Sequence, residues 1–342
     1  MNLYMPQQVF FEPASLEYPL GRKLFSTFSE AGVEMHRVPQ RSFSRYITGS
    51  TGREKYAHSK KTLAVTVKKE IALDVCKPSA DFQFELVSNC PGSCEYCYLQ
   101  TTQGEKPFLR VFVNLEDIFD TIERHIYREE DRITTFEAAS MGDPLALEHL
   151  TGSLAETIEF FGRLENARLR TVTKYSSVDT LTGLKHNGHT RFRFSVNSRY
   201  VIDHFEHNTA SFAERLEAAS RIISAGYPTG FIIAPIMVYE GWKEQYSELF
   251  ERLRSSVGGL RPAEPFTFEL IQHRFTAVSK KLILERFPGT GLDLDEEARA
   301  LKWGRFGRYK YVYPKEVSTE IKSFITALIN DYFPGSKTEY FT

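Results

Sequence analysis

The sequence has few cysteines, almost no net charge and no long apolar run. Its 342 residues include only four cysteines, and the formal net charge is −1. So few cysteines in so long a chain exclude a secreted scaffold held together by disulfides. No stretch reaches the roughly 18 apolar residues of a membrane span, and no basic start followed by an apolar run predicts a signal peptide. We therefore expect a cytoplasmic protein without a membrane partner.

The balanced charge excludes a nucleic-acid-binding protein that is basic over its whole surface. Lysine and arginine together number 43, and aspartate and glutamate number 44. Any contact with DNA therefore has to come from a local basic patch. The length is enough for one large domain or two ordinary ones with a sizeable core.

Short β-rich runs alternate with helical patterns from about residue 80 onward. The runs lie at 82–88, 134–139, 169–173, 191–196, 230–235 and 266–272. Between several of them apolar residues recur with a helical period, as in 147–161 and 212–223. This alternation predicts βα units around a parallel sheet. Six such strands fit either a partial barrel or an open doubly wound sheet, and spacing alone leaves both open.

The two ends of the chain do not follow this rhythm. Residues 1–79 are predicted to form a small N-terminal α/β domain, with a helix at 19–32, a basic loop at 40–61 and a strand at 62–67. The repeating part spans 80–285. Residues 286–342 are predicted to form a C-terminal extension with a β-hairpin at 301–313 and a final helix before Pro334.

Three of the four cysteines lie close together in a loop. Cys90, Cys94 and Cys97 follow the first predicted strand, and the intervening Pro91 and Gly92 let the chain turn back. A structural zinc site and an iron–sulfur cluster each normally take four protein ligands, so three cysteines on a cluster would leave one iron open. Such clusters of thiols are typical of metal sites. Cys76 stands apart, and we expect it to pack as a small buried apolar residue.

The C-x3-C-x2-C spacing, with Tyr96 before the last cysteine, resembles the radical S-adenosylmethionine (SAM) superfamily. Segments 88–101, 136–144, 172–175, 193–197 and 270–276 occur in the order found in the spore photoproduct lyase family and resemble it. The resemblance implies a partial (β/α)6 TIM-type barrel of the radical SAM kind. It also implies a [4Fe–4S] cluster on Cys90, Cys94 and Cys97, with SAM on the fourth iron.

The same resemblance implies an enzyme of DNA repair. It would be a carbon–carbon lyase that reverses the spore photoproduct, a thymine dimer, to two thymines by means of a 5′-deoxyadenosyl radical. Its partners would be damaged DNA and an electron donor such as flavodoxin or ferredoxin. Two alternatives are a radical SAM enzyme that acts on RNA or a peptide, and a non-catalytic, metal-stabilised nucleic-acid-binding module.

Polar residues follow several of the predicted strands at their C-terminal ends, where barrels of this kind hold their active sites. In the family, the positions matching Lys174, Ser195 and Asn197 contact SAM, and a lysine suits the SAM carboxylate. Asp143 is either a further cofactor contact or only a helix N-cap. The candidate cofactor-binding residues are Lys174, Ser195, Asn197, Asp143 and Ala234.

The candidate catalytic residues are Ser140, Tyr98 and Tyr96. The family carries a cysteine at the position matching Ser140, and its thiol is thought to return a hydrogen atom to the thymine radical. Because a hydroxyl is a poorer hydrogen-atom donor, we expect impaired repair with intact SAM cleavage, and we interpret the chain as an engineered Cys→Ser variant. In the family, the position matching Tyr98 relays a hydrogen atom, and Tyr96 is expected near the SAM adenine.

The predicted hairpin mixes basic and aromatic residues. Basic groups suit DNA phosphates, and an inserted aromatic side chain fills the gap left by a displaced base. The family inserts a β-hairpin at the lesion, and this segment matches it by position. The candidate DNA-binding residues are Lys302, Arg305, Phe306, Arg308 and Tyr309.

Overall fold

The computed structural model describes residues 3–128, 132–304, 307 and 309–342. The chain folds into two compact units, each built from two stretches of sequence. The first unit comprises 1–91 and 103–192, and the second comprises 92–102 and 193–342. The boundary therefore passes through the cysteine loop. The expected domain limits at 79 and 285 stay a prediction.

The first unit contains a five-stranded sheet in the order β2-β1-β3-β7-β6. All pairs are parallel except β6 with β7. Every residue of β1 is buried, which places this strand at the centre of a core with α1. The bounds are β1 (Gln8–Phe11), η1 (Pro13–Glu17), α1 (Pro19–Glu30), β2 (Glu34–Arg37), η2 (Gln40–Tyr46), α2 (Gly52–Lys60), β3 (Thr62–Thr66), β6 (Val87–Ser88), β7 (Leu109–Phe112) and α4 (Leu115–Tyr127).

A second group of strands in the first unit has the order β9-β8-β5-β4. In β9 buried and partly exposed residues alternate, as expected of a strand with one covered face. The bounds are β4 (Asp74–Val75), β5 (Phe82–Gln83), β8 (Thr134–Glu137), η3 (Pro144–Leu147), α5 (Glu148–Thr151), α6 (Ser153–Arg163), β9 (Ala167–Thr173) and η4 (Asp179–Leu181).

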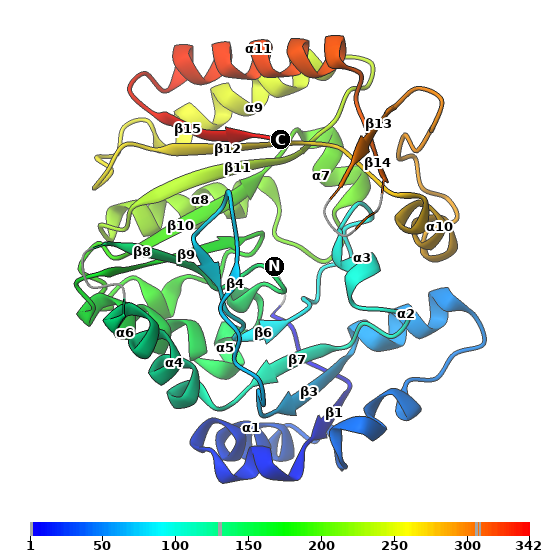
Figure 1. Cartoon of the computed structure of the whole chain (residues 1–342), viewed down its shortest axis with the longest axis vertical. Helices are drawn as coiled ribbons and strands as arrows, with labels where there is room; N and C mark the ends of the chain where they lie inside the picture. Colours follow the sequence, from blue (N-terminus) through cyan, green and yellow to red (C-terminus); the bar gives the residue numbers. More distant parts are fainter. Residues whose placement is uncertain (1–2, 129–131, 305–306, 308) are drawn as a thin grey trace. The chain divides into compact units, whose positions relative to one another are not determined.

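The second unit contains strands in the order β15-β12-β11-β10, of which β10 (Thr190–Val196) begins in the first unit. Figure 1 shows α9 and α11 side by side along β12 and β15, where the Trp242 and Phe324 rings meet edge to face at 5.2 Å. The other bounds are α3 (Leu99–Thr102), α7 (Arg199–Phe205), α8 (Phe212–Ser224), β11 (Thr229–Ile236), α9 (Trp242–Val257), β12 (Thr267–Gln272), α10 (Ala277–Arg286), β13 (Ala300–Trp303), β14 (Tyr309–Val312), α11 (Lys315–Tyr332) and β15 (Lys337–Phe341).

Most predicted elements are present, and three predictions are wrong. The run 82–88 is not one strand, because β5 and β6 belong to different sheets and the chain crosses between them at Phe84–Leu86. The segment 40–61 is not a loop but holds η2 and α2, whose N-cap Thr51 accepts a hydrogen bond from Glu54 N at 3.1 Å. The expected helix at 147–161 is broken at Gly152, which has φ +72°.

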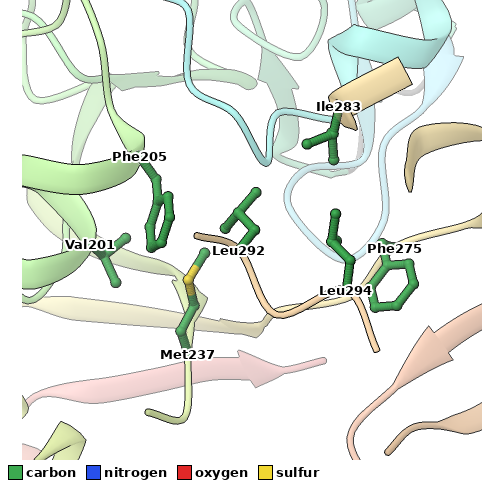
Figure 2. Close-up of a cluster of buried hydrophobic side chains, with 7 residues drawn as sticks. All are labelled: Val201, Phe205, Met237, Phe275, Ile283, Leu292 and Leu294. Carbon is green, nitrogen blue, oxygen red and sulfur yellow. The ribbon is translucent and has the colours of Figure 1, made fainter. Parts of the chain in front are cut away.

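The second unit has a buried apolar cluster that supports the cysteine loop. Figure 2 shows its side chains, which come from α7, α10 and the segments that follow β11, β12 and α10. Tyr96 packs against this cluster.

Among the described residues, no helix combines the length and apolar character needed to cross a bilayer.

Candidate functional site

The three clustered cysteines, Cys90, Cys94 and Cys97, form no disulfide within the described part of the chain. Cys94 is buried, whereas Cys90 and Cys97 are partly exposed. Backbone hydrogen bonds hold the loop within the second unit, from Ser93 N to His207 O at 2.8 Å and from Glu95 N to Phe205 O at 2.9 Å. Both bonds anchor backbone next to Cys94, so the main chain beside this thiol is fixed by the fold.

The donor set of the loop fits an iron–sulfur cluster better than a single metal ion. Within the part of the chain that the structure describes, no three His, Cys, Asp or Glu side chains gather around one point as ligands of one ion. In a [4Fe–4S] cluster each cysteine ligates a different iron, so its sulfurs need not converge on one point. Three cysteines on one loop that form no disulfide, with Cys94 held by anchored backbone, meet that requirement.

A buried ion pair lies directly behind the loop. Arg215 Nη2 contacts Glu206 Oε2 at 2.5 Å, and both side chains are fully buried. Tyr96 donates its hydroxyl hydrogen to the other oxygen of Glu206. Burial, and then the charge of Glu206, raise the pKa of Tyr96 well above its usual value, so the hydroxyl keeps its proton. Through this hydrogen bond, Tyr96 connects the part of the loop between Cys94 and Cys97 to the ion pair.

Sequence reasoning missed both members of the pair. Arg215 also donates to the backbone carbonyl of Ser195 at 3.0 Å and to that of Ala210 at 2.8 Å. These bonds connect α8 with the end of β10. Nothing in the sequence marked Glu206 or Arg215, because neither belongs to a motif and only the fold brings them together with Tyr96.

The other end of the loop is held in the first unit by Lys60. Its ammonium donates to Asn89 Oδ1 at 2.9 Å and to Cys90 O at 2.8 Å. Asn89 has φ +67°, a conformation that Asn tolerates better than most residues. Lys60 belongs to the basic segment 40–61, and the structure places its charge against the backbone at Cys90.

The segment that carries Ser140 approaches the same loop. Asn89 N donates to Met141 O at 2.6 Å, and Asn89 pairs with Gly142 in an isolated parallel bridge. A Cβ atom at Gly142 would lie 2.6 Å from Asn89 O, closer than real Cβ contacts. Glycine is therefore required here, and its absence of a side chain brings Ser140 near the start of the cysteine loop.

Cys76 is not the small buried apolar residue that the sequence predicted. Its side chain is partly exposed, and its sulfur lies 3.2 Å from Ser140 Oγ. The two residues are 64 positions apart, so no local pattern could reveal this contact. The structure thus places the fourth cysteine of the chain beside a candidate catalytic residue.

Asp143 organises the neighbourhood of Lys174 within the first unit. Its carboxylate accepts hydrogen bonds from Thr173 Oγ1 at 3.0 and 2.9 Å and from Lys174 N at 3.0 Å. It occupies the N-cap position of η3, where the backbone N–H groups of Leu145 and Ala146 face its carboxylate and lower its pKa. The side chain also fixes the backbone from which Lys174 extends.

Asp143 should make stability depend on pH. Burial raises its pKa to about 6 from 3.8, against the opposing hydrogen bonds from Lys174 and Thr173. At this group the folded state then binds more protons than the unfolded state between these values, so the contribution of Asp143 to the unfolding free energy should fall as pH rises from about 4 to 6. The difference between the folded and unfolded pKa values of Asp143 corresponds to about 3 kcal/mol of unfolding free energy. We expect Asp143→Asn to remove this slope in urea unfolding at pH 4, 5, 6 and 7.

The matched control is the exposed carboxylate of Asp74. Asp74→Asn makes the same chemical change without burial, so it should retain the pH dependence of the unaltered protein. An unchanged slope in Asp143→Asn would contradict the assignment of this pH dependence to Asp143.

The remaining cofactor candidates lie in the second unit. Ser195 is in β10, Asn197 follows it directly, and Ala234 is near the end of β11. Asn197 donates to Pro235 O and accepts from Tyr246 OH, both at 2.8 Å. Its side chain therefore joins the ends of β10 and β11. Contact of Ser195, Asn197 and Ala234 with SAM stays a prediction.

The predicted hairpin is present as β13 and β14, with Lys302 paired to Lys310 and Trp303 to Tyr309 (Figure 1). Trp303 and Tyr309 are exposed, and their rings meet edge to face at 4.8 Å. The hairpin is anchored where Phe275 stacks on Tyr311 at 5.1 Å. The predicted contacts Arg305, Phe306 and Arg308 lie outside the described residues.

Comparison with known proteins identifies relatives along the whole chain. The family model described as spore photoproduct lyase matches residues 4–342. A spore photoproduct lyase of Geobacillus sp. is 46% identical over 342 residues, covering 100% of both chains. A solved spore photoproduct lyase complexed with dinucleoside spore photoproduct is 46% identical, with a TM-score of 0.97 and 100% coverage of both chains.

A further solved relative is a double mutant of spore photoproduct lyase with bound AdoMet and dinucleoside spore photoproduct. It is 47% identical, with a TM-score of 0.97 over 100% of both chains. Its two changes, cysteine to alanine and serine to cysteine, fall at the positions matching Ser140 and Cys76 of this chain. These full-length likenesses confirm the predicted fold, a mixed α/β partial barrel of the radical SAM kind.

Proposed function

The chain belongs to the spore photoproduct lyase family, and from this premise we propose how its residues divide the work of the reaction. It is a radical SAM lyase that repairs DNA by reversing the spore photoproduct. The observation that carries this function is the match over residues 4–342, which includes the loop with Cys90, Cys94 and Cys97. The assignments of individual residues below are proposals.

Cys90, Cys94 and Cys97 are the proposed ligands of a [4Fe–4S] cluster. When bound, the cluster and SAM supply a 5′-deoxyadenosyl radical that removes a hydrogen atom from C6 of the lesion. The protein orients the reactants and excludes side reactions. The contacts of Lys60 with Cys90 and of Tyr96 with Glu206 support the proposal that both ends of the loop are positioned by the fold.

The cofactor SAM is proposed to bind near the strand ends that carry the polar candidates. Lys174, whose backbone is fixed by Asp143, suits the SAM carboxylate because an ammonium and a carboxylate form a charge-assisted hydrogen bond. In the second unit, Ser195, Asn197 and Ala234 at β10 and β11 are the proposed cofactor contacts. A flavodoxin or ferredoxin is the proposed electron donor.

The function is tested by an anaerobic assay with the reconstituted protein, SAM and a chemical reductant. We expect 5′-deoxyadenosine to form and dinucleoside spore photoproduct to be converted to the thymidine dinucleoside, with no conversion when SAM is omitted. Release of 5′-deoxyadenosine without conversion of the lesion would instead favour another substrate, such as RNA or a peptide.

Tyr98 is proposed to relay a hydrogen atom between the 5′-deoxyadenosyl group and the protein. Tyr98 is 57% exposed, so its ring is not buried in the core. We expect Tyr98→Phe, which removes only the hydroxyl, to lower the repair rate while leaving the affinity for SAM unchanged. Repair kinetics and equilibrium SAM binding check this, and an unaltered rate would reject the role.

The hairpin is proposed to hold the DNA at the lesion. Its exposed Trp303 and Tyr309 suit insertion beside a displaced base, and the paired Lys302 and Lys310 suit phosphates. Each phosphate contact contributes about 0.9 to the slope of log affinity against log salt on duplex DNA. We expect Lys302→Ala/Lys310→Ala to weaken binding and to reduce this slope by about 1.8.

The control for this measurement is Lys315→Ala, which removes an exposed lysine just after the hairpin, in the first turn of α11. It should change neither the affinity nor the slope. If the double variant binds lesion-containing duplex with the unaltered salt dependence, these lysines do not contact the phosphates.

A further inference from the structure

One step of the proposed repair reaction requires a hydrogen-atom donor. After the methylene bridge of the lesion breaks, one thymine carries an unpaired electron on its methylene carbon. A single hydrogen atom converts that carbon into the methyl group of thymine. A thiol donates hydrogen atoms more readily than an aliphatic hydroxyl because its S–H bond is weaker than an O–H bond. Ser140 is therefore chemically unsuited to this step.

The number of cysteines in the chain limits which residue can be the hydrogen-atom donor. The sequence has four cysteines, and three of them are the proposed cluster ligands. A cysteine bound to metal is a thiolate and has no S–H hydrogen to give. In the loaded enzyme Cys76 is then the one cysteine that retains an S–H bond.

The structure places this thiol beside the candidate catalytic position. Cys76 Sγ and Ser140 Oγ lie 3.2 Å apart, and both side chains are partly exposed. A group attached at either residue therefore reaches almost the same point in space. Ser140 in turn belongs to the segment that Gly142 allows to approach Asn89 and the start of the cysteine loop.

A buried carboxylate holds the two segments together. Cys76 begins a turn in which Ser79 N and Ala80 N donate to its carbonyl oxygen at 2.9 and 3.2 Å. Ser79 Oγ donates to one oxygen of Glu137 at 3.2 Å, and Ala139 N donates to the other at 3.1 Å. Glu137 is only 2% exposed. It ties the turn of Cys76 to the residue before Ser140, so their contact is part of the fold.

A solved relative has a thiol in the same place. The double mutant with a cysteine matching Cys76, and an alanine matching Ser140, holds AdoMet and dinucleoside spore photoproduct. In that protein, a thiol at this position is compatible with both bound molecules. Relative to its unmutated sequence, this chain has cysteine and serine exchanged between the two positions.

We propose that Cys76 is the hydrogen-atom donor of this enzyme, with Ser140 as its hydrogen-bonding neighbour. The inference rests on the proposed function. It replaces the expectation, based on Ser140 alone, that repair is impaired. In this chain the thiol would then belong to Cys76 instead of position 140, and the sulfur lies 3.2 Å from Ser140 Oγ.

The step is balanced in atoms and electrons. The S–H bond of Cys76 breaks homolytically, a C–H bond forms on the methylene carbon, and Cys76 becomes a thiyl radical. The thiyl regains a hydrogen atom from the 5′-deoxyadenosine that first received one from the lesion. The established SAM-dependent reaction therefore supplies the balancing hydrogen, and no further oxidant or reductant is needed.

The test compares Cys76→Ser with the unaltered holoenzyme on dinucleoside spore photoproduct. We expect repair to fall on the order of a hundredfold, while 5′-deoxyadenosine release and the iron–sulfur absorption persist. In D2O the thiol exchanges its hydrogen, so the unaltered enzyme should place deuterium in the thymine methyl group and Cys76→Ser should not. The exchange Cys76→Ser/Ser140→Cys should restore both repair and deuterium uptake.

A second readout does not depend on turnover. Iodoacetamide should alkylate Cys76 of the holoenzyme, as mapped by mass spectrometry, and dinucleoside spore photoproduct should protect it. The control Val75→Ser introduces the same new residue at the exposed preceding position and should leave repair unchanged.

The outcomes separate this inference from the function on which it rests. If the unaltered enzyme cleaves SAM without repairing the dinucleoside, the proposed function fails. If the unaltered enzyme repairs and Cys76→Ser repairs equally well with the same deuterium uptake, Cys76 is not the donor. A loss that Ser140→Cys does not restore, without substrate protection of Cys76, would also overturn the proposal and show a structural role.

Discussion

Replacing Cys94 by alanine is expected to give a colourless protein that releases no 5′-deoxyadenosine from SAM. Cys94 is buried in the loop, between backbone bonds from Ser93 and Glu95 to the second unit. A site with only three cysteines has no spare ligand among the thiols of this loop, so the loss of one should prevent stable cluster assembly. Visible absorption, iron and sulfide content, and the anaerobic SAM-cleavage assay measure the effect.

Cys76→Ala is the matched control for cluster assembly, because it removes the one cysteine outside the loop. It should keep the colour and the iron content of the unaltered protein. A brown Cys94→Ala protein with full iron content would show that this thiol is not a ligand.

Glu206→Gln is expected to lower the unfolding free energy by about 3–5 kcal/mol, because it leaves a buried guanidinium without its counter-charge. Arg215 is 0% exposed and contacts Glu206 at 2.5 Å. The same carboxylate accepts the hydroxyl hydrogen of Tyr96. We therefore expect the cysteine loop to lose its support as well, and the reconstituted variant to retain less iron. Urea unfolding and iron content are the measurements.

Glu248→Gln is the matched control for this prediction. Glu248 and Arg252 form an exposed pair at 3.5 Å on α9, and such pairs contribute about 1 kcal/mol or less. Their disruption should hardly change the unfolding free energy. If Glu206→Gln is as stable as Glu248→Gln, the ion pair of Arg215 does not stabilise the fold in the way we infer.

Both predictions concern the cysteine loop. The first removes one of its cysteines, and the second removes a buried contact that supports it. The cysteines were evident from the sequence because their spacing is local. The ion pair was not, because Glu206 and Arg215 lie more than a hundred residues after the loop and carry no motif. The hydroxyl of Tyr96 shows the difference well. Its hydroxyl donates a hydrogen bond to Glu206, which the sequence did not reveal, and its place near SAM stays a prediction.

The secondary structure was predictable where a pattern is local and regular. The strand of 191–196 and the capped helix of 212–223 are present nearly as expected, because the β-rich composition of the first and the helical period of the second are local features. The run 82–88 was misread because its alternation of apolar and polar residues does not show that the chain changes sheets at Phe84–Leu86. The strand β1 was missed because its four buried residues show no alternation.

The sequence by itself determined the family, the cluster loop and the hairpin, since each is written in a short run of neighbouring residues. Only the tertiary structure decided where Cys76 lies and which side chain it contacts. As one of four cysteines it had no visible partner, and a lone thiol is ordinarily a packing residue. Folding brings its sulfur to 3.2 Å from Ser140 through Ser79 and Glu137. Such a contact depends on the pairing of strands distant in the chain, and no local pattern encodes it.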